Sequence, residues 1–320
     1  NDILFSIAGT LGRVSVVKSS ILPANINQAL AILRINEGYI PYLTTVLKGR
    51  AVEDFIRRNP TIGAQPNLSL EQVNNLDISY PNYDEQVRIG QYFSNLDNLI
   101  TLHQRKYDKL VNIKKSMIEK MFPQNGACVP EIRFKGFTDD WEQRKLGEVG
   151  SVSMCRRIFK EQTSESGDIP FYKIGTFGGQ ADAYISRELF AEYRSKYPYP
   201  KEGDILISAS GSIGRTVEFT GKNEYFQDSN IVWLSHDDRL DNTFLKYFYS
   251  VVKWAGIEGS TIKRLYNDNI LNTVISMPSV AEQRKIGTFF KKLDNLITLH
   301  QRKIEKLKNI KKSCLEKMFV

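Results

Sequence analysis

The hydrophobic pattern of this chain contains one long helical segment that occurs twice. From Gln86 and again from Gln283, more than thirty residues pass without a proline, and apolar residues recur at steps of three and four. This period predicts a long amphipathic helix in each place. The stripe predicted to face a partner helix consists of Leu96, Leu99, His103, Lys106, Leu110, Ile113 and Met117 in the first copy, and of Leu293, Leu296, His300, Lys303, Leu307, Ile310 and Cys314 in the second.

The two helical segments have nearly the same sequence. Residues 93–122 and 290–319 share 23 of 30 positions at a constant offset of 197. A core tolerates drift, yet residues typical of exposed positions are repeated too, among them Asp97 and Asp294. We therefore expect two equivalent surfaces, which meet two copies of one partner or each other, and an antiparallel, pseudo-twofold pairing of the helices.

Short apolar runs separated by turn residues predict a globular part before each helix. The expected strands are 2–6, 14–17, 29–35 and 76–80 in the first part and 204–208, 216–219, 230–234 and 273–277 in the second, with helices at 40–56 and 242–254. Pro81 and Pro278 should end the last strands, because proline cannot continue a ladder. Trp141 and Leu146 are expected to anchor the second part in its core.

The predicted fold class is α+β, with two globular parts separated by two long repeated helices that pack as an antiparallel coiled coil. The expected boundaries are 1–85 for the first globular part, 86–123 for the first helix, 124–130 for a linker, 131–282 for the second globular part and 283–320 for the second helix. Residues 131–202 have no counterpart in the first repeat, so the first part is expected to lack its front portion.

Two repeated features allow two interpretations each. The turns at Gly9–Gly12 and Gly211–Gly214 are either phosphate-binding turns, followed by Arg13 and Arg215, or strand-to-strand turns that need positive φ. His103 and His300 are either a pH-sensitive or ligating pair, or polar positions that set the register of a helix seam.

Composition restricts the function further. The chain carries a net charge of +8 at 41% apolar and 25% charged residues, which is typical of a folded protein and favours a polyanionic partner. Its three cysteines lie far apart in the sequence and fit neither a disulfide framework nor a metal site. No membrane partner and a cytoplasmic location are expected.

Motifs for chemistry are missing from the sequence. It contains no P-loop, no HExxH or paired-cysteine metal spacing, no Asn/Asp-Pro-Pro-aromatic motif for methyl transfer and no acidic-plus-lysine nuclease pattern. We therefore expect no catalytic residues and no metal site, and a self-sufficient methyltransferase or nuclease is disfavoured.

Basic and amide side chains collect instead in the predicted loops, where they suit phosphates and base edges. The two parts have matching loops with different residues, so they either read two different sequences or have simply drifted. The expected DNA-binding residues are Lys263, Arg264, Tyr266, Asn267, Arg156, Arg157, Lys160, Lys173 and Arg215 in the second part, and Arg13, Gln65 and Asn67 in the first.

The order of motifs resembles the specificity (S) subunit of type I restriction–modification enzymes. The similarity rests on residues 130–137 (PEIRFKGF), 141–148 (WEQRKLGE) and 278–287 (PSVAEQRKIG), on Glu85-Gln86, and on the repeated helix ending in [Ile/Leu]-Glu-Lys-Met-Phe. The resemblance covers essentially the whole chain. One departure is the short first part, which leaves recognition by residues 1–92 alone open.

The resemblance implies a non-catalytic subunit that binds a bipartite sequence in double-stranded DNA through two target-recognition domains. Two methylation (M) subunits would dock on the repeated helices, and restriction/translocation (R) subunits would join them. S-adenosylmethionine, ATP and Mg²⁺ would then belong to those partners, with no cofactor in this chain. The expected partner-binding residues are Leu96, Leu99, Gln104, Arg105, Leu293, Leu296, Gln301 and Arg302. The alternative is a non-enzymatic, pseudo-symmetric coiled-coil scaffold that binds other proteins.

Overall fold

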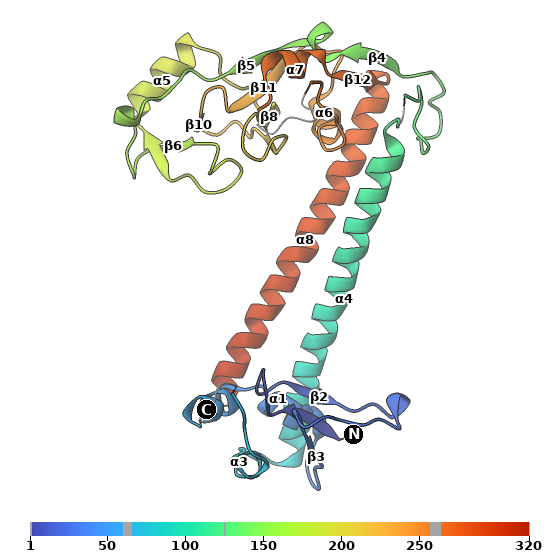
Figure 1. The fold of residues 1–320 in the computed structure, drawn as a ribbon, viewed down its shortest axis with the longest axis vertical. Helices are drawn as coiled ribbons and strands as arrows, with labels where there is room; N and C mark the ends of the chain where they lie inside the picture. The colour runs from blue at the N-terminus through green and yellow to red at the C-terminus, as the bar shows by residue number, and fades with distance from the viewer. Residues whose placement is uncertain (1, 60–65, 125, 257–263, 320) are drawn as a thin grey trace. The chain divides into compact units, whose positions relative to one another are not determined.

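A computed structural model describes residues 2–59, 66–124, 126–256 and 264–319 of the chain. The chain divides into two compact units, Asn1–Lys109 with Ile297–Val320, and Leu110–Leu296. Each unit combines a sheet with helices, which confirms the α+β class (Figure 1).

The first unit is built on a three-stranded antiparallel sheet in the order β2-β1-β3. The short elements of this unit are β1 (Ile3–Ser6), β2 (Val14–Val16), η1 (Ser19–Ile21), β3 (Leu30–Leu33), α1 (Ile40–Val46), α2 (Arg50–Arg58) and α3 (Leu70–Asn74). The single helix expected at 40–56 is therefore two helices. The chain turns at Gly49, whose amide donates to the carbonyl of Val46 at 2.8 Å and which precedes α2 in an extended conformation.

The second unit contains a four-stranded sheet (β5-β11-β8-β9), a three-stranded sheet (β10-β6-β7) and the pair β12-β4. Its short elements are β4 (Glu142–Lys145), η2 (Leu146–Glu148), β5 (Gly150–Met154), η3 (Lys160–Gln162), β6 (Ile169–Tyr172), β7 (Ala183–Ile185), α5 (Arg187–Lys196), β8 (Ile205–Ser208), β9 (Thr216–Glu218), β10 (Tyr225–Phe226), β11 (Ile231–His236), α6 (Asn242–Phe248), α7 (Asn267–Asn272) and β12 (Val274–Met277). Helix α6 ends earlier than the expected 242–254. It begins at Asp241, whose carboxylate accepts from the amides of Thr243 and Phe244.

The sheets of the two units share three strands in the same order. Strands β2-β1-β3 correspond to β9-β8-β11, and all four pairings are antiparallel. In the second unit β5 adds a fourth strand to β11, and β4 pairs with β12. The stretch that supplies β4 and β5 has no counterpart in the first repeat of this sequence. The strand expected at 76–80 does not form, which follows because a strand needs a ladder partner such as β4.

The glycine turns are held by a serine in both units. The Ser6 hydroxyl donates to the carbonyl of Thr10 at 2.6 Å and accepts from the amide of Arg13 at 2.7 Å. Ser208 makes the same two contacts, with Ser212 and Arg215. All four glycines of these turns have positive φ, and several of the turn amides already donate within the turn. Of the two interpretations, the strand-to-strand turn is the one that the structure favours.

The long helices are α4 (Tyr83–Met121) and α8 (Val280–Met318), and a buried glutamine fixes the start of each. The Gln283 amide accepts from the Asp241 amide at 2.8 Å and donates to the carbonyls of Arg239 and Pro278, both at 2.9 Å. Gln86 accepts from the Tyr39 amide at 3.0 Å and donates to the carbonyl of Pro81 at 2.9 Å. The Glu-Gln motif therefore joins each helix to its own globular part.

The helices pack antiparallel in both units, along a stripe that keeps Leu96, His103, Leu110 and Met117 of the predicted one and differs from it at the three positions between them. Leu99 and Ile113 are exposed, at 43% and 37%. Their places in the seam are taken by residues one position later, so that the observed stripe in α4 is Phe93, Leu96, Ile100, His103, Tyr107, Leu110, Lys114, Met117 and Met121. The prediction chose the apolar Ile113 over Lys114, but Lys114 lies in the seam because it pairs with Asp294 across it at 2.6 Å.

Contacts in the seam follow the sequence repeat. Asp97 pairs with Lys311 at 2.5 Å in the first unit, and the equivalent residues Asp294 and Lys114 pair in the second. His103 lies against His300, its own counterpart, with 2.9 Å between the two Nδ1 atoms. This confirms the antiparallel coiled coil within each unit.

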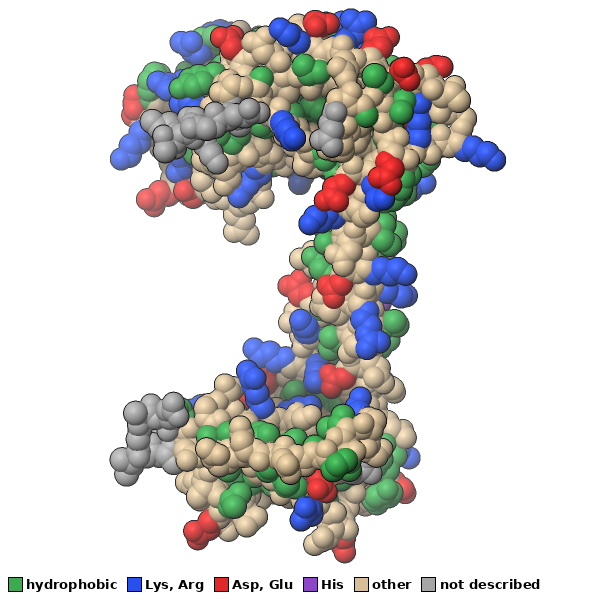
Figure 2. All heavy atoms as spheres, turned by 45° about the vertical axis from the view of Figure 1, so that its right-hand side comes forward, with side chains coloured by type: hydrophobic (Ala, Val, Ile, Leu, Met, Phe, Trp, Pro, Cys, Tyr) green, Lys and Arg blue, Asp and Glu red, His purple; other side chains and the backbone are tan. Residues whose placement is uncertain are grey.

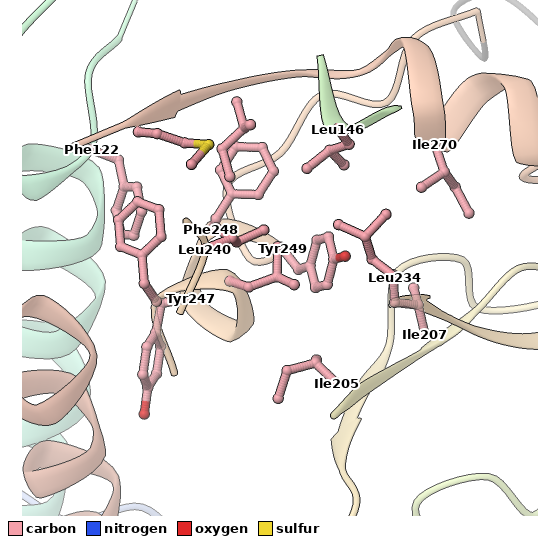
Figure 3. Packing of buried hydrophobic residues seen from close by; sticks show 14 of the residues in the cluster. Phe122, Leu146, Ile205, Ile207, Leu234, Leu240, Tyr247, Phe248, Tyr249 and Ile270 are labelled. Atoms are coloured by element: carbon pink, nitrogen blue, oxygen red, sulfur yellow. The ribbon is translucent and has the colours of Figure 1, made fainter. Parts of the chain in front are cut away.

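The last phenylalanine of each helix enters the core around the start of the other helix. Phe319 lies 5.9 Å from Phe93, and Phe122 lies 6.3 Å from Phe290, measured between ring centroids. In the second unit this core extends from Phe122 and Tyr247 to Leu234 and Ile270 (Figure 3). Trp141 and Leu146 are buried in it as predicted, so the core ties the repeated helices to the sheet.

Candidate nucleic-acid interface

The clearest gathering of predicted DNA-binding residues is around the turn between β10 and β11. The Arg157 guanidinium donates to the Asp228 carboxylate at 2.9 Å, and the Arg264 guanidinium donates to the Ser229 hydroxyl at 3.1 Å. Two loops separated by about a hundred residues in sequence therefore meet at one turn. We call residues 227–230 the hub turn.

The hub turn is firmly built and contains an unusual backbone conformation. Ser229 has a φ of +41°, and no other non-glycine residue in the described part of the chain has a positive φ. Gln227 accepts from the Ile174 amide at 2.8 Å, and Asn230 accepts from the Ser210 hydroxyl at 2.8 Å. Strain of this kind persists only where the surroundings impose it, and it is concentrated at functional sites.

Aromatic rings accompany the arginines of both loops. The Arg264 guanidinium lies 5.8 Å from the centre of the Tyr266 ring, and Arg156 lies 5.3 Å from that of Tyr197. Asn267 is exposed at the start of α7. Lys263, the other residue predicted in this loop, lies outside the described residues, as does Gln65 in the first unit. Arginine and tyrosine together offer both phosphate pairing and stacking surfaces.

Lys173 and Arg215 belong to a neighbouring cluster that involves the loop 173–182. The Arg215 guanidinium donates to the Phe177 carbonyl at 2.8 Å, while the Lys173 ammonium pairs with Asp182 at 2.9 Å. Arg215 follows the glycine turn, whose Ser210 reaches the hub turn, so the two clusters are connected. Lys160 is exposed at the start of η3, in the same loop as Arg157.

The ion pairs of this region are exposed and therefore weak. Arg157 is 61% exposed in its pair with Asp228, and Lys173 is 44% exposed in its pair with Asp182. Exposed pairs typically contribute about 0–1 kcal/mol, so a DNA phosphate can replace the carboxylate at little cost. Lys and Arg side chains are spread over the visible face of this unit among other residues (Figure 2).

The layer beneath these loops is inert. Cys155, directly before the two arginines, is buried, and burial raises the pKa of its thiol to about 12. Its neighbour Tyr225 donates to the Arg156 carbonyl at 3.1 Å, and burial raises the pKa of that phenol as well. A thiol held protonated is a poor nucleophile, so this layer supports the loops rather than reacting.

The first unit repeats the attachment of the second loop. The Leu68 amide donates to the Ile7 carbonyl at 2.8 Å, and the Leu265 amide donates to the Ala209 carbonyl at 2.8 Å. This contact places Asn67, which bridges to Ala8, beside the glycine turn that precedes Arg13. The two units therefore hold different side chains on the same attachment.

The predicted partner-binding residues of the helices fall into two groups. Leu96 and Leu293 are buried in the cores, whereas Leu99 and Leu296 are each 43% exposed. Gln104 and Gln301 line a hollow of about 500 Å³ beside the seam of the first unit. Sequence reasoning missed the exposed pair Leu102 and Leu299, although their identity in the two repeats was a signal. Arg105 and Arg302 are exposed.

Among the described residues, no group of three or more His, Cys, Asp and Glu side chains is arranged to hold a metal ion. No helix in this part of the chain is both long and apolar enough to span a bilayer.

Comparison with known proteins identifies the family. The sequence matches the description "Type I restriction modification DNA specificity domain" over residues 1–112 and 138–309. A Haemophilus influenzae protein named as a type I restriction enzyme specificity subunit is 60% identical over 153 residues, which are 48% of this chain and 40% of that protein. The type I restriction enzyme MjaVIII specificity subunit of Methanocaldococcus jannaschii is 23% identical over 334 residues, covering 98% of this chain and 77% of the relative.

Solved structures show the same fold. The S subunit of a type I restriction–modification system from M. genitalium has a TM-score of 0.66 at 18% identity, covering 100% of this chain and 83% of that one. The HsdS subunit from Thermoanaerobacter tengcongensis has a TM-score of 0.52 at 18% identity and covers 99% of this chain and 80% of that one.

Two α+β units on a repeated helix pair, with basic and aromatic residues together in the loops of the second unit, define a DNA-recognition protein. The chain belongs to the type I restriction–modification DNA specificity family, which matches most of its length. Its role is DNA recognition rather than catalysis, because catalysis in type I systems belongs to the methylation and restriction subunits. The alternative of a coiled-coil scaffold that binds other proteins is not favoured.

Proposed function

We propose that the chain recognises a DNA sequence in two separated parts, one for each unit. The observation that carries this proposal is the shared attachment of different loops. Leu68 and Leu265 make the same backbone contact in the two units, yet they are flanked by Asn67 and Ser69 in one loop and by Arg264 and Tyr266 in the other. Two loops that share one backbone attachment but present different side chains would contact different bases with the same geometry.

Within the second unit, Arg157 and Arg264 are the residues proposed to contact DNA first. Both donate to the hub turn in the free protein, which gathers their guanidinium groups at one place, and the weak Arg157–Asp228 pair can be exchanged for a phosphate. Preorganised groups lose less side-chain entropy on binding. Arg156, Lys160, Lys173, Arg215 and Asn267 would extend the contact, and Arg13 and Asn67 would serve the first unit.

The repeated helices are proposed to dock the partner subunits. Leu99 with Leu102, and Leu296 with Leu299, leave two identical apolar patches exposed beside Arg105 and Arg302. Two identical patches suit two copies of one partner, which we take to be the methylation subunit. S-adenosylmethionine would then be bound by that subunit, and ATP and Mg²⁺ would be used by restriction subunits that complete the assembly.

Selection from a randomised duplex library tests the recognition proposal. The chain would be assayed with and without its methylation subunit, over a range of salt concentrations. Enrichment of a split motif, with affinity falling steeply as salt rises, is the expected result. Enrichment of a single half-site would show that the first unit of this chain does not read bases. No enrichment with the partner present would contradict the proposal.

Alanine variants then separate base contacts from phosphate contacts. Replacing an arginine that reads a base should cost about 1–3 kcal/mol on the selected duplex and relax the preference at one position. Replacing one that binds phosphate should weaken all duplexes and lower the salt slope by about 1. Arg157→Ala and Arg264→Ala are the test variants. Arg144→Ala is the matched control, because Arg144 also forms an exposed carboxylate pair, with Glu142 on β4.

A further inference from the structure

Two aromatic rings beside the hub turn are exposed without a packing role. Phe159 is 51% exposed and Tyr266 is 63% exposed, and no other aromatic residue in the described part of the second unit reaches half exposure. An exposed ring contributes little to stability, since the stabilisation comes from burial of apolar area. Neither ring is needed to fill the core, so its position calls for another explanation.

The same device holds both rings. The Phe159 amide donates to the side-chain oxygen of Gln162 at 2.9 Å, and the Gln162 amide group donates onward to the Tyr193 hydroxyl at 3.3 Å. The Tyr266 amide donates to the side-chain oxygen of Asn269 at 2.9 Å, and Asn269 donates onward to the Ala255 carbonyl at 2.8 Å. In each loop an amide side chain three residues later clamps the backbone under the exposed ring.

The two rings also share a charged setting. Phe159 lies in sequence between Arg157 and Lys160, and Tyr266 lies under the guanidinium of Arg264. Arg157 and Arg264 bind adjacent residues of the hub turn, so both rings belong to one basic surface. Positive charge around a rigid, exposed ring suits a ligand that is polyanionic and has flat apolar faces. Among macromolecules, this describes nucleic-acid bases on their phosphate backbone.

We infer that Phe159 and Tyr266 stack on bases of the DNA half-site and open a base step when the second unit binds. This inference rests on the proposed function of DNA recognition. Insertion of an apolar side chain between base pairs partly unstacks them, and this cost is recovered through additional protein contact. The arginines beside the rings hold the backbone while the ring enters the step. A partly opened step also eases removal of a nearby base from the duplex, which any base-modifying partner requires.

Binding and fluorescence measured on the same duplex test this inference. The whole chain, with its methylation subunit, would bind the selected duplex carrying 2-aminopurine at successive positions of the half-site. Wild-type protein should raise the fluorescence at one step. Phe159→Ala should weaken binding by about 5- to 150-fold, the range for loss of a base–aromatic stack, and abolish the fluorescence rise. Tyr266→Ala should act in the same direction.

A mismatched base pair at the step that carries the 2-aminopurine should partly restore binding of the Phe159→Ala variant. Because a mismatched step is already partly unstacked, Phe159→Ala should lose less affinity on the mismatched duplex than on the matched one. Phe159→Tyr should retain both affinity and signal, while Phe159→Leu should keep the signal as an apolar wedge but lose affinity, because an aliphatic chain offers no flat face to stack on. Val274→Ala is the control, since Val274 is 53% exposed on the edge strand β12 and should change neither readout.

The outcomes separate the two proposals. Wild-type protein that prefers no sequence contradicts the proposed function itself. Wild-type preference together with a Phe159→Ala variant that binds and reports like wild type overturns the stacking role alone. A Phe159→Leu variant that binds as tightly as wild type overturns it as well, because an apolar side chain without a ring would then suffice. Both ring residues are exposed, so their variants should unfold at the wild-type temperature.

Discussion

At the scale of single residues, Gln283 joins the start of α8 to two loops through three hydrogen bonds, and it is fully buried. Gln283→Ala would leave one amide and two carbonyls without partners, which should destabilise the second unit by about 1–3 kcal/mol. Urea unfolding followed by tryptophan fluorescence measures this. All three tryptophans, Trp141, Trp233 and Trp254, lie in the second unit, so the signal reports on that unit.

Gln86 supplies the matched control for this change. It occupies the equivalent place in the first unit and makes two hydrogen bonds instead of three. Gln86→Ala should therefore leave the tryptophan transition where it is. A Gln283→Ala protein with an unchanged transition would show that the motif has no anchoring role.

Tyr249 is a residue for which the loss of a polar group should be harmless. Its hydroxyl is buried and has no hydrogen-bond partner among the described residues, and burial raises the pKa of the phenol. Tyr249→Phe removes the desolvated hydroxyl and keeps the ring, so stability should be unchanged or rise by up to about 1 kcal/mol. Tyr249→Ala should instead lose about 3–5 kcal/mol, because it leaves a cavity in the core. The same urea experiment compares them, and a clear loss in Tyr249→Phe would point to a hidden partner.

At the scale of elements, the seam between α4 and α8 contains a titrating contact. The Nδ1 atoms of His103 and His300 are 2.9 Å apart, so at least one ring must be neutral to accept the hydrogen bond. Burial lowers the pKa of His103 below 6.5, and the charges of His300, Lys303 and Lys106 lower it further. In the unfolded chain the same ring keeps its ordinary pKa of about 6.5.

The sign of the pH effect follows from this shift. As the pH falls below about 6.5, the unfolded chain binds more protons than the folded chain does. The contribution of His103 to the free energy of unfolding is therefore complete above about pH 6.5 and is lost as the pH falls from there through the lowered pKa. Helix content measured by circular dichroism during thermal unfolding at pH 8 and pH 5 should show the loss. The double change His103→Asn with His300→Asn should flatten it, because asparagine keeps a polar pair without a titrating group. Replacing His236, the third histidine, should leave the loss in place.

The long helices were predictable, but at every second position of the predicted stripe the residue in the seam is the next one along the chain. Apolar spacing alone favoured Leu99 and Ile113, because leucine and isoleucine usually mark a core. The seam accepts Lys114 instead, since Asp294 of the other helix lies opposite to it. Such a contact depends on the register between two segments that are far apart in the sequence, and a local sequence pattern carries no information about that register. The leucines that this register leaves exposed are identical in the two copies, and their repetition indicates a shared partner surface and not a buried position.

The candidate site was predictable in its residue types and not in its geometry. Basic residues in loops pointed to Arg157 and Arg264, but their meeting at the hub turn, on Asp228 and Ser229, depends on how β10 and β11 are placed. Phe159 was overlooked because a phenylalanine within an apolar pair, Ile158-Phe159, is typical of a core position. Only its 51% exposure distinguishes it.

At the scale of the whole molecule, the two repeated leucine patches predict how many methylation subunits bind to one chain. If each patch docks one methylation subunit, Leu99→Ser with Leu102→Ser should reduce the assembly to one subunit per chain, and Leu296→Ser with Leu299→Ser should do the same. Changing all four should prevent assembly. Native mass spectrometry of the complex gives the count directly.

The exposed positions of these leucines make the test interpretable. Side chains that are 43–47% exposed contribute little to the fold, so the variants should unfold like wild type. Leu96→Ser is the contrasting control, since Leu96 is buried and its loss should lower stability before it affects docking. Two bound subunits in the first double variant would place docking elsewhere on the helices.

The pairing of His103 with His300 has a genetic consequence. The two copies are in frame at an offset of 197 residues, so a deletion that joins one copy to the other removes a whole recognition unit without a frameshift. The hybrid helix that remains would still fit an antiparallel copy of itself, because the seam contacts already join equivalent residues. Such a shortened gene product would pair with its twin and carry two copies of the same unit where its parent carries two different ones.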